Sequence, residues 1–339
     1  MSDKKYNVAV LGATGVVGKE LFNVLEERHF PIESLLPLAS SRTAGSEVVF
    51  KGKPLKVELA GKDSFKGVDI ALFSAGASIS KEFAPYAVKA GAVVIDNTSH
   101  FRMDPEVPLV VPEVNAHAIK RHKGIIANPN CSTAQMVVAL KPIHDAYRIK
   151  RIVVSTYQAV SGWGKEAVDE LEQQVKAWVS GKPIETKILP KQIAFNAVPQ
   201  IDSFVESGYT KEELKMINET KKIMEDESIA VTATTVRVPV FIGHSEAVNL
   251  ELEKPCSAKE VRSLLSKAPG VKVMDDPENK VYPTVLDCVG IDDTLVGRIR
   301  KDPSVESGLD LWIVSDNLRK GAATNAVQIA EELIKQGLL

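Results

Sequence analysis

Cys131 is the residue of this sequence with the clearest capacity for covalent chemistry. It follows the short apolar segment Ile125–Ala127 and the turn Asn128-Pro129-Asn130, and a helical pattern of apolar residues begins at Ala134. This pattern predicts a strand, a turn and a helix, with the thiol at the start of the helix. A helix N-terminus favours the nucleophilic thiolate, and its N–H groups can stabilise an oxyanion. Cys131 is therefore a candidate nucleophile, with a buried structural cysteine as the commoner alternative.

Two side chains far along the chain could assist such a nucleophile. His244 follows Gly243 at a tight connection between two predicted strands. Because its ordinary pKa is about 6.5, a histidine is a natural general acid or base for a cysteine intermediate. Arg237 could bind a carboxylate with its planar guanidinium, and its alternative is a surface salt bridge. Neither residue by itself shows whether its role is catalytic or structural.

A glycine-rich turn near the N-terminus is typical of dinucleotide binding. The predicted strand Asn7–Leu11 runs into a segment with a glycine at every third position, and a helical pattern follows. Such glycines permit a tight turn, a close approach of the pyrophosphate and close packing of helix on strand, and the helix N-terminus faces the phosphates. A turn without a ligand is the alternative. The candidate cofactor residues in this turn are Gly12, Thr14, Gly15, Val16, Val17 and Gly18.

The residues after the second predicted strand favour NADP over NAD. That strand, Ser34–Ala39, is followed by Ser40, Ser41, Arg42 and Thr43, with no acidic residue among them. NAD sites often hold the ribose hydroxyls with an Asp or Glu at this place, whereas an Arg accommodates a 2′-phosphate. These four residues are therefore candidate ligands of the NADP 2′-phosphate.

The elements around these residues predict two domains. In residues 1–130, short apolar strands alternate with helical patterns, which predicts an α/β fold with a parallel sheet, a Rossmann-like NADP-binding domain. In residues 131–317, longer strands alternate polar and apolar residues, as in Ser245–Glu253, which predicts an α+β domain with a largely antiparallel mixed sheet. Thr210 is expected to cap a helix at Lys211–Met224. The C-terminal helix, at about 318–339, is expected to return to the first domain.

Composition argues against several classes of protein. Lys and Arg number 42 against 44 Asp and Glu, and no dense basic tract points to nucleic acid or a membrane surface. No apolar signal core or membrane-spanning run is visible, and no cluster of metal ligands. Three cysteines are too few for a disulfide framework and indicate a reducing compartment, so a cytoplasmic enzyme without a metal is expected. Of the other two cysteines, Cys256 is expected in a loop and Cys288 in a strand at Val285–Ile291.

The chain resembles the aspartate-β-semialdehyde dehydrogenases along essentially its whole length. Several ordered motifs carry the resemblance, and together they are far more specific than any one of them. The matching segments are Gly12–Gly18, Asn97-Thr98-Ser99 with Phe101-Arg102, Pro129–Ser132, Tyr157–Gly162, Arg237–Pro239 through Gly243–Ser245, and Asp316–Ala323.

The resemblance implies a role for each matching residue. Cys131 would be the nucleophile, His244 the acid or base, and Gln158 would orient the substrate near the sulfur. The implied substrate-binding residues are Arg237 for the carboxylate, Glu212 for the amino group, Arg102 and Lys215 for the phosphate, and Asn130 beside the nucleophile. The implied cofactor is NADP(H), with Ser161, Gly162 and Asn317 as further contacts.

The reaction implied is the NADPH-dependent reduction of L-aspartyl 4-phosphate to L-aspartate 4-semialdehyde and phosphate. It would place the enzyme in the pathway to diaminopimelate, lysine, threonine, methionine and isoleucine. Family members form homodimers through the second domain. Whether two such dimers associate into a dimer of dimers is left open. Two residues depart from the family pattern, Trp163 and His100, and either could reshape the cofactor cleft.

Two alternatives remain at this point. N-acetylglutamyl-phosphate reductase shares the plan and the cysteine chemistry. Glu212 and Arg237 favour a free amino acid, because an acetylated amine carries no charge to pair with a carboxylate. A non-catalytic NADP-binding sensor would need only the glycine-rich turn and would have no use for Cys131 with His244.

Overall fold

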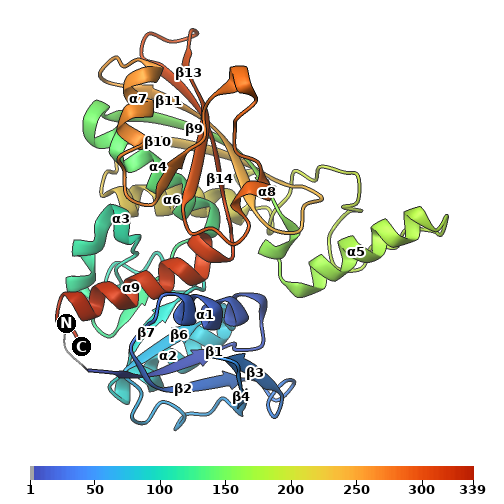
Figure 1. The fold of residues 1–339 in the computed structure, drawn as a ribbon, viewed down its shortest axis with the longest axis vertical. Coiled ribbons are helices and arrows are strands. Elements are labelled where there is room, and N and C mark those ends of the chain that lie inside the picture. The colour runs from blue at the N-terminus through green and yellow to red at the C-terminus, as the bar shows by residue number, and fades with distance from the viewer. Residues whose placement is uncertain (1–3) are drawn as a thin grey trace. The chain divides into compact units, whose positions relative to one another are not determined.

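The structure is a computed structural model that describes residues 4–339 (Figure 1). The chain divides into two compact units. The first comprises the chain up to Asn130 together with Ala322–Leu339, and the second comprises Cys131–Gly321. Among the described residues, no helix is both long and apolar enough to span a membrane.

The first unit is built on a parallel sheet with the strand order β5-β2-β1-β6-β7-β8. Side chains of β1 alternate between two apolar cores, with Val8 and Val10 in one and Ala9 and Leu11 in the other. Burial on both faces explains why the central strands β1, β6 and β7 are almost wholly apolar. This sheet confirms the predicted Rossmann-type fold. The strands are β1 (Tyr6–Leu11), β2 (Ile32–Ala39), β5 (Glu58–Leu59), β6 (Ile70–Phe73), β7 (Val93–Asp96) and β8 (Ile125–Ala127).

The C-terminal helix α9 (Thr324–Lys335) packs within the first unit, beside α1 (Val16–Glu27), as Figure 1 shows. Arg28 at the end of α1 donates hydrogen bonds of 2.9 and 2.7 Å to the Glu331 carboxylate on α9. The other elements of this unit are the hairpin β3 (Glu47–Phe50) and β4 (Lys53–Lys56), α2 (Ala77–Lys89), α3 (Pro112–Asn115) and a 3-10 helix at Ala116–Arg121.

The second unit contains a mixed sheet with the order β10-β9-β11-β14-β13-β12. Its three antiparallel pairs are β9–β11, β11–β14 and β13–β14, and its two parallel pairs are β9–β10 and β12–β13. The prediction of a largely antiparallel mixed sheet is therefore confirmed. The strands are β9 (Ile149–Gln158), β10 (Ala230–Arg237), β11 (His244–Leu252), β12 (Val271–Val273), β13 (Thr294–Asp302) and β14 (Gly308–Ser315).

Helices α4 (Cys131–Tyr147), α6 (Lys211–Met224) and α7 (Ala258–Leu265) pack against this sheet, while α5 (Lys165–Val179) extends away from it (Figure 1). The predicted cap of α6 is present, because Thr210 and Glu213 form a reciprocal capping box. Glu213 also accepts the N–H of Thr235 at 2.9 Å, which ties the start of α6 to β10. Short 3-10 helices lie at Val160–Gly162 and Pro277–Asn279, and a π-helical turn at Arg319–Ala323.

The strand predicted around Cys288 is wrong. The residues form the short helix α8 (Val285–Cys288), which begins after a capping box between Thr284 and Asp287. The Asp287 carboxylate accepts both the backbone N–H and the hydroxyl of Thr284 at 2.7 Å, and this local preference outweighs the β-branched residues of the segment. Cys288 is buried at the end of that turn, and burial raises the pKa of its thiol to about 12.

Candidate active site

Cys131 is the first residue of α4, directly after β8 and the turn that contains Asn130. Its side chain is partly exposed. The chain returns close to it at Gly321, where an added Cβ would lie 2.7 Å from the Cβ of Cys131. A glycine is needed at position 321 because a side chain there would displace the thiol. The thiol therefore lies where the sequence predicted, at a strand-to-helix turn.

Three candidate residues form one row across neighbouring strands of the second unit. The last residues of β10 and β9, Arg237 and Gln158, are paired in register, and Gln158 is paired with His244, the first residue of β11. Residues paired across strands point to the same face of a sheet. The sheet therefore brings the guanidinium of Arg237, the amide of Gln158 and the imidazole of His244 together at one end of these strands. In the sequence, 79 positions separate residue 158 from residue 237.

His244 is fully buried and its ring is held in one orientation. Its Nδ1 accepts the backbone N–H of Ala159 at 3.0 Å, so the neutral ring carries its proton on Nε2. Burial, followed by the positive charge of Arg237, lowers the pKa of His244 to about 3. Nε2 has no hydrogen-bond partner within the described chain. At neutral pH the residue can thus offer one N–H to a bound group.

Arg237 is 4% exposed, and one of its Nη atoms donates to the carbonyl of Ala159 at 2.7 Å. Burial lowers the pKa of Arg237, while the charges of Glu212 and Cys131 act in the opposite direction. A Cβ added at Gly162 would lie 3.0 Å from the guanidinium and 3.2 Å from Nε2 of His244. The 3-10 turn Val160–Gly162 therefore packs against both side chains and limits their movement.

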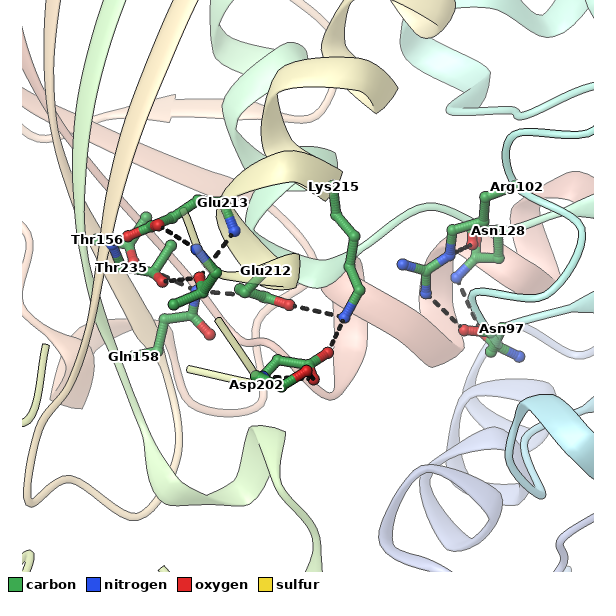
Figure 2. Close-up of polar contacts among 12 residues, drawn as sticks. Asn97, Arg102, Asn128, Thr156, Gln158, Asp202, Glu212, Glu213, Lys215 and Thr235 are labelled. Carbon is green, nitrogen blue, oxygen red and sulfur yellow. Dashed lines mark hydrogen bonds and ion pairs between the residues drawn. The ribbon is translucent and has the colours of Figure 1, made fainter. Parts of the chain in front are cut away.

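A chain of polar contacts runs from Gln158 to the first turns of α6, as Figure 2 shows. Gln158 donates to Glu212 at 3.4 Å, and the Nζ of Lys215 donates to the other oxygen of Glu212 at 3.1 Å. Residues three positions apart on a helix lie on the same face, which explains the second contact. The Nζ of Lys215 also donates to Asp202 at 3.0 Å. This group could bind an ammonium through Glu212 and an anion through Lys215.

Arg102, in the first unit, is buried and holds two backbone segments. Its Nε donates to the carbonyl of Asn128 at 2.9 Å, and one Nη donates to the carbonyl of Asn97 at 2.7 Å (Figure 2). The side chain of Asn128 donates to the Oδ1 of Asn97 at 2.7 Å and accepts from Asn325 on α9 at 2.5 Å. This network fixes the segment that leads to Asn130.

The glycine-rich turn has the shape that a dinucleotide requires. Gly12 has φ of +92°, and a Cβ there would lie 2.9 Å from backbone atoms of Ser74. A Cβ on Gly18 would lie 2.1 Å from the carbonyl oxygen of Gly12, so the third glycine permits the close packing of α1. Gly15 is the N-cap of α1 and offers no side chain to its N–H groups. A phosphate can take that place.

The residues after β2 fit a 2′-phosphate. Ser40, Ser41 and Arg42 are exposed. The hydroxyls of Thr14 and Thr43 lie 2.9 Å apart, which joins this loop to the glycine-rich turn. Exposed hydroxyls and one arginine, without a carboxylate, suit a phosphorylated ribose.

Asn317 braces the turn that precedes His244. Its Oδ1 accepts the N–H of Gly243 at 2.8 Å, and its Nδ2 donates to the Oγ of Ser161 at 3.0 Å. Asn317 and Ser161, both predicted as cofactor contacts, are thus bound to each other in the second unit. Trp163, one of the two residues that depart from the family pattern, follows the same turn and is exposed.

Three polar residues of this site were missed in the sequence: Gln135, Glu246 and Asp202. Gln135 donates to the carbonyl of His244 at 3.3 Å. Glu246 is fully buried, and burial raises its pKa well above the usual range, while the side chain of Gln135 acts in the opposite direction. Spacing could have suggested the first two, because Gln135 follows Cys131 by one helical turn and Glu246 follows His244 by one strand period. Asp202 lies in a loop, where spacing carries no such signal.

Comparison with known proteins identifies the family. Residues 7–122 match the model of the semialdehyde dehydrogenase NAD binding domain, and residues 140–320 match that of the semialdehyde dehydrogenase dimerisation domain. The chain is 59% identical to the aspartate-semialdehyde dehydrogenase of Aquifex aeolicus, over 98% of this chain and 99% of that protein. The chain belongs to the aspartate-semialdehyde dehydrogenase family. This membership confirms the predicted enzyme class, an NADP-dependent oxidoreductase of amino-acid biosynthesis, over the sensor and the acetylglutamyl alternative.

Solved structures of aspartate-semialdehyde dehydrogenases agree with this assignment. The fold matches aspartate semialdehyde dehydrogenase II of Vibrio cholerae complexed with ASA, with a TM-score of 0.95 and 52% identity over 98% of this chain and 99% of that one. The enzyme of Candida albicans, solved with NADP, matches with a TM-score of 0.76 and 27% identity over 99% of this chain and 100% of that one. The match to a dimerisation domain also supports a homodimer.

Proposed function

We propose that this enzyme reduces L-aspartyl 4-phosphate to L-aspartate 4-semialdehyde and phosphate through a thioester on Cys131. The observation that carries the proposal is the row of Arg237, Gln158 and His244 across β10, β9 and β11. Helix α4, which begins with Cys131, packs on the same sheet, and Gln135 links that helix to the backbone of His244. The proposed nucleophile Cys131, the N–H donor His244 and the carboxylate-binding Arg237 are thus all held by the mixed sheet and the helix packed on it.

Charged groups of the second unit match a free amino acid. Arg237 binds the substrate carboxylate, and Glu212, which is 5% exposed, binds its ammonium. Gln158 orients the acyl group, with Asn130 next to the nucleophile. Lys215 and Arg102 are the proposed cations for the phosphate. An acetylated amine carries no charge to pair with the Glu212 carboxylate, which disfavours such a substrate.

The thiolate of Cys131 attacks the acyl carbon, so that a C–S bond forms and the bond from carbon to the phosphate oxygen breaks. NADPH, when bound, supplies the hydride that reduces the thioester. The resulting hemithioacetal oxyanion expels Cys131 as the thiolate and leaves the aldehyde. Negative charge develops on the substrate oxygen in both stages. We assign to His244 the role of a neutral donor that stabilises this charge through Nε2–H, because Nδ1 is already occupied.

Cofactor binding is assigned to three segments. The glycine-rich turn from Gly12 to Gly18 holds the pyrophosphate against the start of α1. Ser40–Thr43 accept the 2′-phosphate, and Ser161, Gly162 and Asn317 are the proposed contacts from the second unit.

The test is the phosphate-dependent oxidation of aspartate semialdehyde, followed at the nicotinamide absorbance with NADP and then with NAD. Cys131→Ala should abolish turnover and leave NADPH binding unchanged, as measured by fluorescence titration. Cys256→Ala is the matched control and should keep full activity, because Cys256 lies outside the site. Substantial turnover by Cys131→Ala would refute the thioester route.

Assembly and location complete the proposal. The face of the mixed sheet that carries Tyr157, Ala247 and Trp312 has a hollow of about 590 Å³. Tyr157 is 38% exposed, and its ring lies 5.5 Å from that of Trp312. We assign this face to the homodimer interface, and a dimer of dimers is an outcome that the mass in solution decides. A cytoplasmic location is also proposed, because the three cysteines form no disulfide in the described chain.

A further inference from the structure

Asp202 is the second carboxylate bound to Lys215. Its Oδ2 lies 3.0 Å from the Nζ of Lys215, and its Oδ1 accepts the backbone N–H of Ser203 at 2.8 Å (Figure 2). The side chain of Asp202 is 37% exposed, whereas that of Lys215 is 25% exposed and that of Glu212 is 6% exposed. Of the two carboxylates on Lys215, Asp202 is thus the one that solvent or a ligand can reach.

The loop that carries Asp202 is anchored at both ends. Before it, Val198 and Arg237 exchange two backbone hydrogen bonds of 2.8 and 2.9 Å. After it, the carbonyl of Ser203 accepts the N–H of Lys211 at 2.9 Å, at the start of α6. Asp202 itself has φ of +67°, a left-handed conformation that is uncommon for residues other than glycine, asparagine and aspartate. The fold therefore holds this carboxylate between the end of β10, which carries Arg237, and the start of α6, which carries Glu212 and Lys215.

The charges around Lys215 do not suit an anion site as they stand. Lys215 contributes one positive charge, while Glu212 and Asp202 contribute two negative charges. Burial acts to lower the pKa of Lys215, but the two carboxylates outweigh it and raise the pKa, so the ammonium stays charged. Glu212 has a task in the proposed function, since it binds the substrate ammonium. Asp202 has none, and its charge opposes a phosphate at Lys215.

We propose that Asp202 is an exchangeable counter-ion of Lys215, a positioning residue that competes with phosphate for the ammonium. This inference rests on the proposed phosphate role of Lys215. In the free enzyme Asp202 holds the Nζ in place and neutralises it. When a phosphate group arrives, Asp202 gives up part of this contact, which weakens phosphate binding. Phosphate is the product of the reductive reaction, and weaker binding hastens its departure.

Asp202→Asn tests the inference, because asparagine keeps the acceptor oxygen, tolerates the left-handed backbone and removes only the charge. The KM for phosphate in the oxidation of aspartate semialdehyde should fall about three- to tenfold, the size expected for one charge beside a partly exposed cation. The KM values for semialdehyde and NADP should stay unchanged. The difference should shrink as salt is added, since screening weakens both competitors. A purely structural role would predict neither the selectivity nor the salt dependence.

Two variants make the result decisive. Asp202→Gly also suits the left-handed backbone and deletes the carboxylate, so it too should lower the KM for phosphate. Lys215→Met should raise this KM. If Lys215→Met leaves the KM unchanged, the proposed phosphate role of Lys215 fails, and the inference fails with it. If Lys215→Met raises the KM but neither Asp202 variant lowers it, the role of Asp202 alone is overturned.

Discussion

At the scale of single residues, the role proposed for His244 depends on where its ring carries a proton. A histidine with its ordinary pKa of about 6.5 would act as a base by accepting a proton on Nε2. In this structure Nδ1 accepts the N–H of Ala159, and burial with the charge of Arg237 lowers the pKa to about 3. The ring is therefore neutral at physiological pH and already carries a proton on Nε2. This protonation state is the reason for proposing that His244 acts as a fixed N–H donor.

This role predicts how activity depends on pH and on the side chain at position 244. The value of kcat/KM should show no acid limb from the imidazole between about pH 5 and pH 8, because the ring stays neutral there. His244→Ala should lose about 100- to 1,000-fold in kcat, the usual loss when one donor to an oxyanion is removed. His244→Gln should keep more activity than His244→Ala, since an amide can still donate an N–H.

An acid limb near pH 6.5 that disappears in His244→Gln would instead show that the ring acts as a base.

Stability gives an independent check on the same pKa. The unfolded chain binds a proton on this ring near pH 6.5, but the folded chain does so only near the lowered pKa of about 3. Acidification from about pH 6.5 to about pH 3 therefore lowers the free energy of unfolding. In chemical denaturation, His244→Gln should show a smaller loss of stability over this pH range.

At the scale of elements, the 3-10 turn Val160–Gly162 packs against the two residues proposed to bind the substrate carboxylate and to donate an N–H. It follows β9 directly, and its last residue lies against both Arg237 and His244. A Cβ at position 162 would come within 3.0 Å of the guanidinium. Only glycine leaves both side chains in the row that the three strands define.

Gly162→Ala should therefore reduce catalysis without unfolding the protein. The added methyl group pushes Arg237 and His244 by a few tenths of an ångström, and small misplacements in an active site can cost about 10- to 100-fold in rate. Steady-state kinetics and thermal unfolding measure the two effects. Gly61→Ala is the matched control, since its Cβ would meet no atom closer than 3.7 Å. Wild-type kcat/KM in Gly162→Ala would show that this turn does not position the site.

At the scale of the whole molecule, one face of the mixed sheet is covered by α4, α6 and α7. Partly exposed aromatic and small residues gather on the opposite face, around Tyr157, Ala247 and Trp312. Ala247 is at the middle of this face, because it pairs with Ser155 of β9 on one side and with Trp312 of β14 on the other. An apolar, partly exposed face of this kind suits a second copy of the chain.

Ala247→Glu should convert the homodimer into monomers, because it would bury an unpaired carboxylate in the proposed interface. In the monomer this side chain reaches solvent, so folding should be preserved. Sedimentation velocity measures the mass in solution. Val49→Glu, on the β3–β4 hairpin of the first unit, is the control and should remain dimeric, since Val49 is 64% exposed and lies outside this face. A dimer that survives Ala247→Glu would place the interface elsewhere.

The sequence by itself determined the features that depend on local pattern. The glycine spacing from Gly12 to Gly18 predicted the cofactor turn, and the apolar period after Cys131 predicted the helix that begins with the thiol. Strand composition predicted both sheets, since burial on two faces or on one leaves a distinct pattern. The same local method was wrong at Cys288, where a capping box outweighs β propensity.

Only the tertiary structure decided which distant groups meet. Ala159 and His244 are 85 residues apart, and their contact, which fixes the proton of the ring, exists because β9 and β11 are neighbours in register. The ion pair of Asp202 with Lys215 depends on a loop anchored to β10 and α6. Spacing along the chain shows which residues share a face of one element. Strand order and register determine which faces meet, and with them the protonation and charge balance of the site.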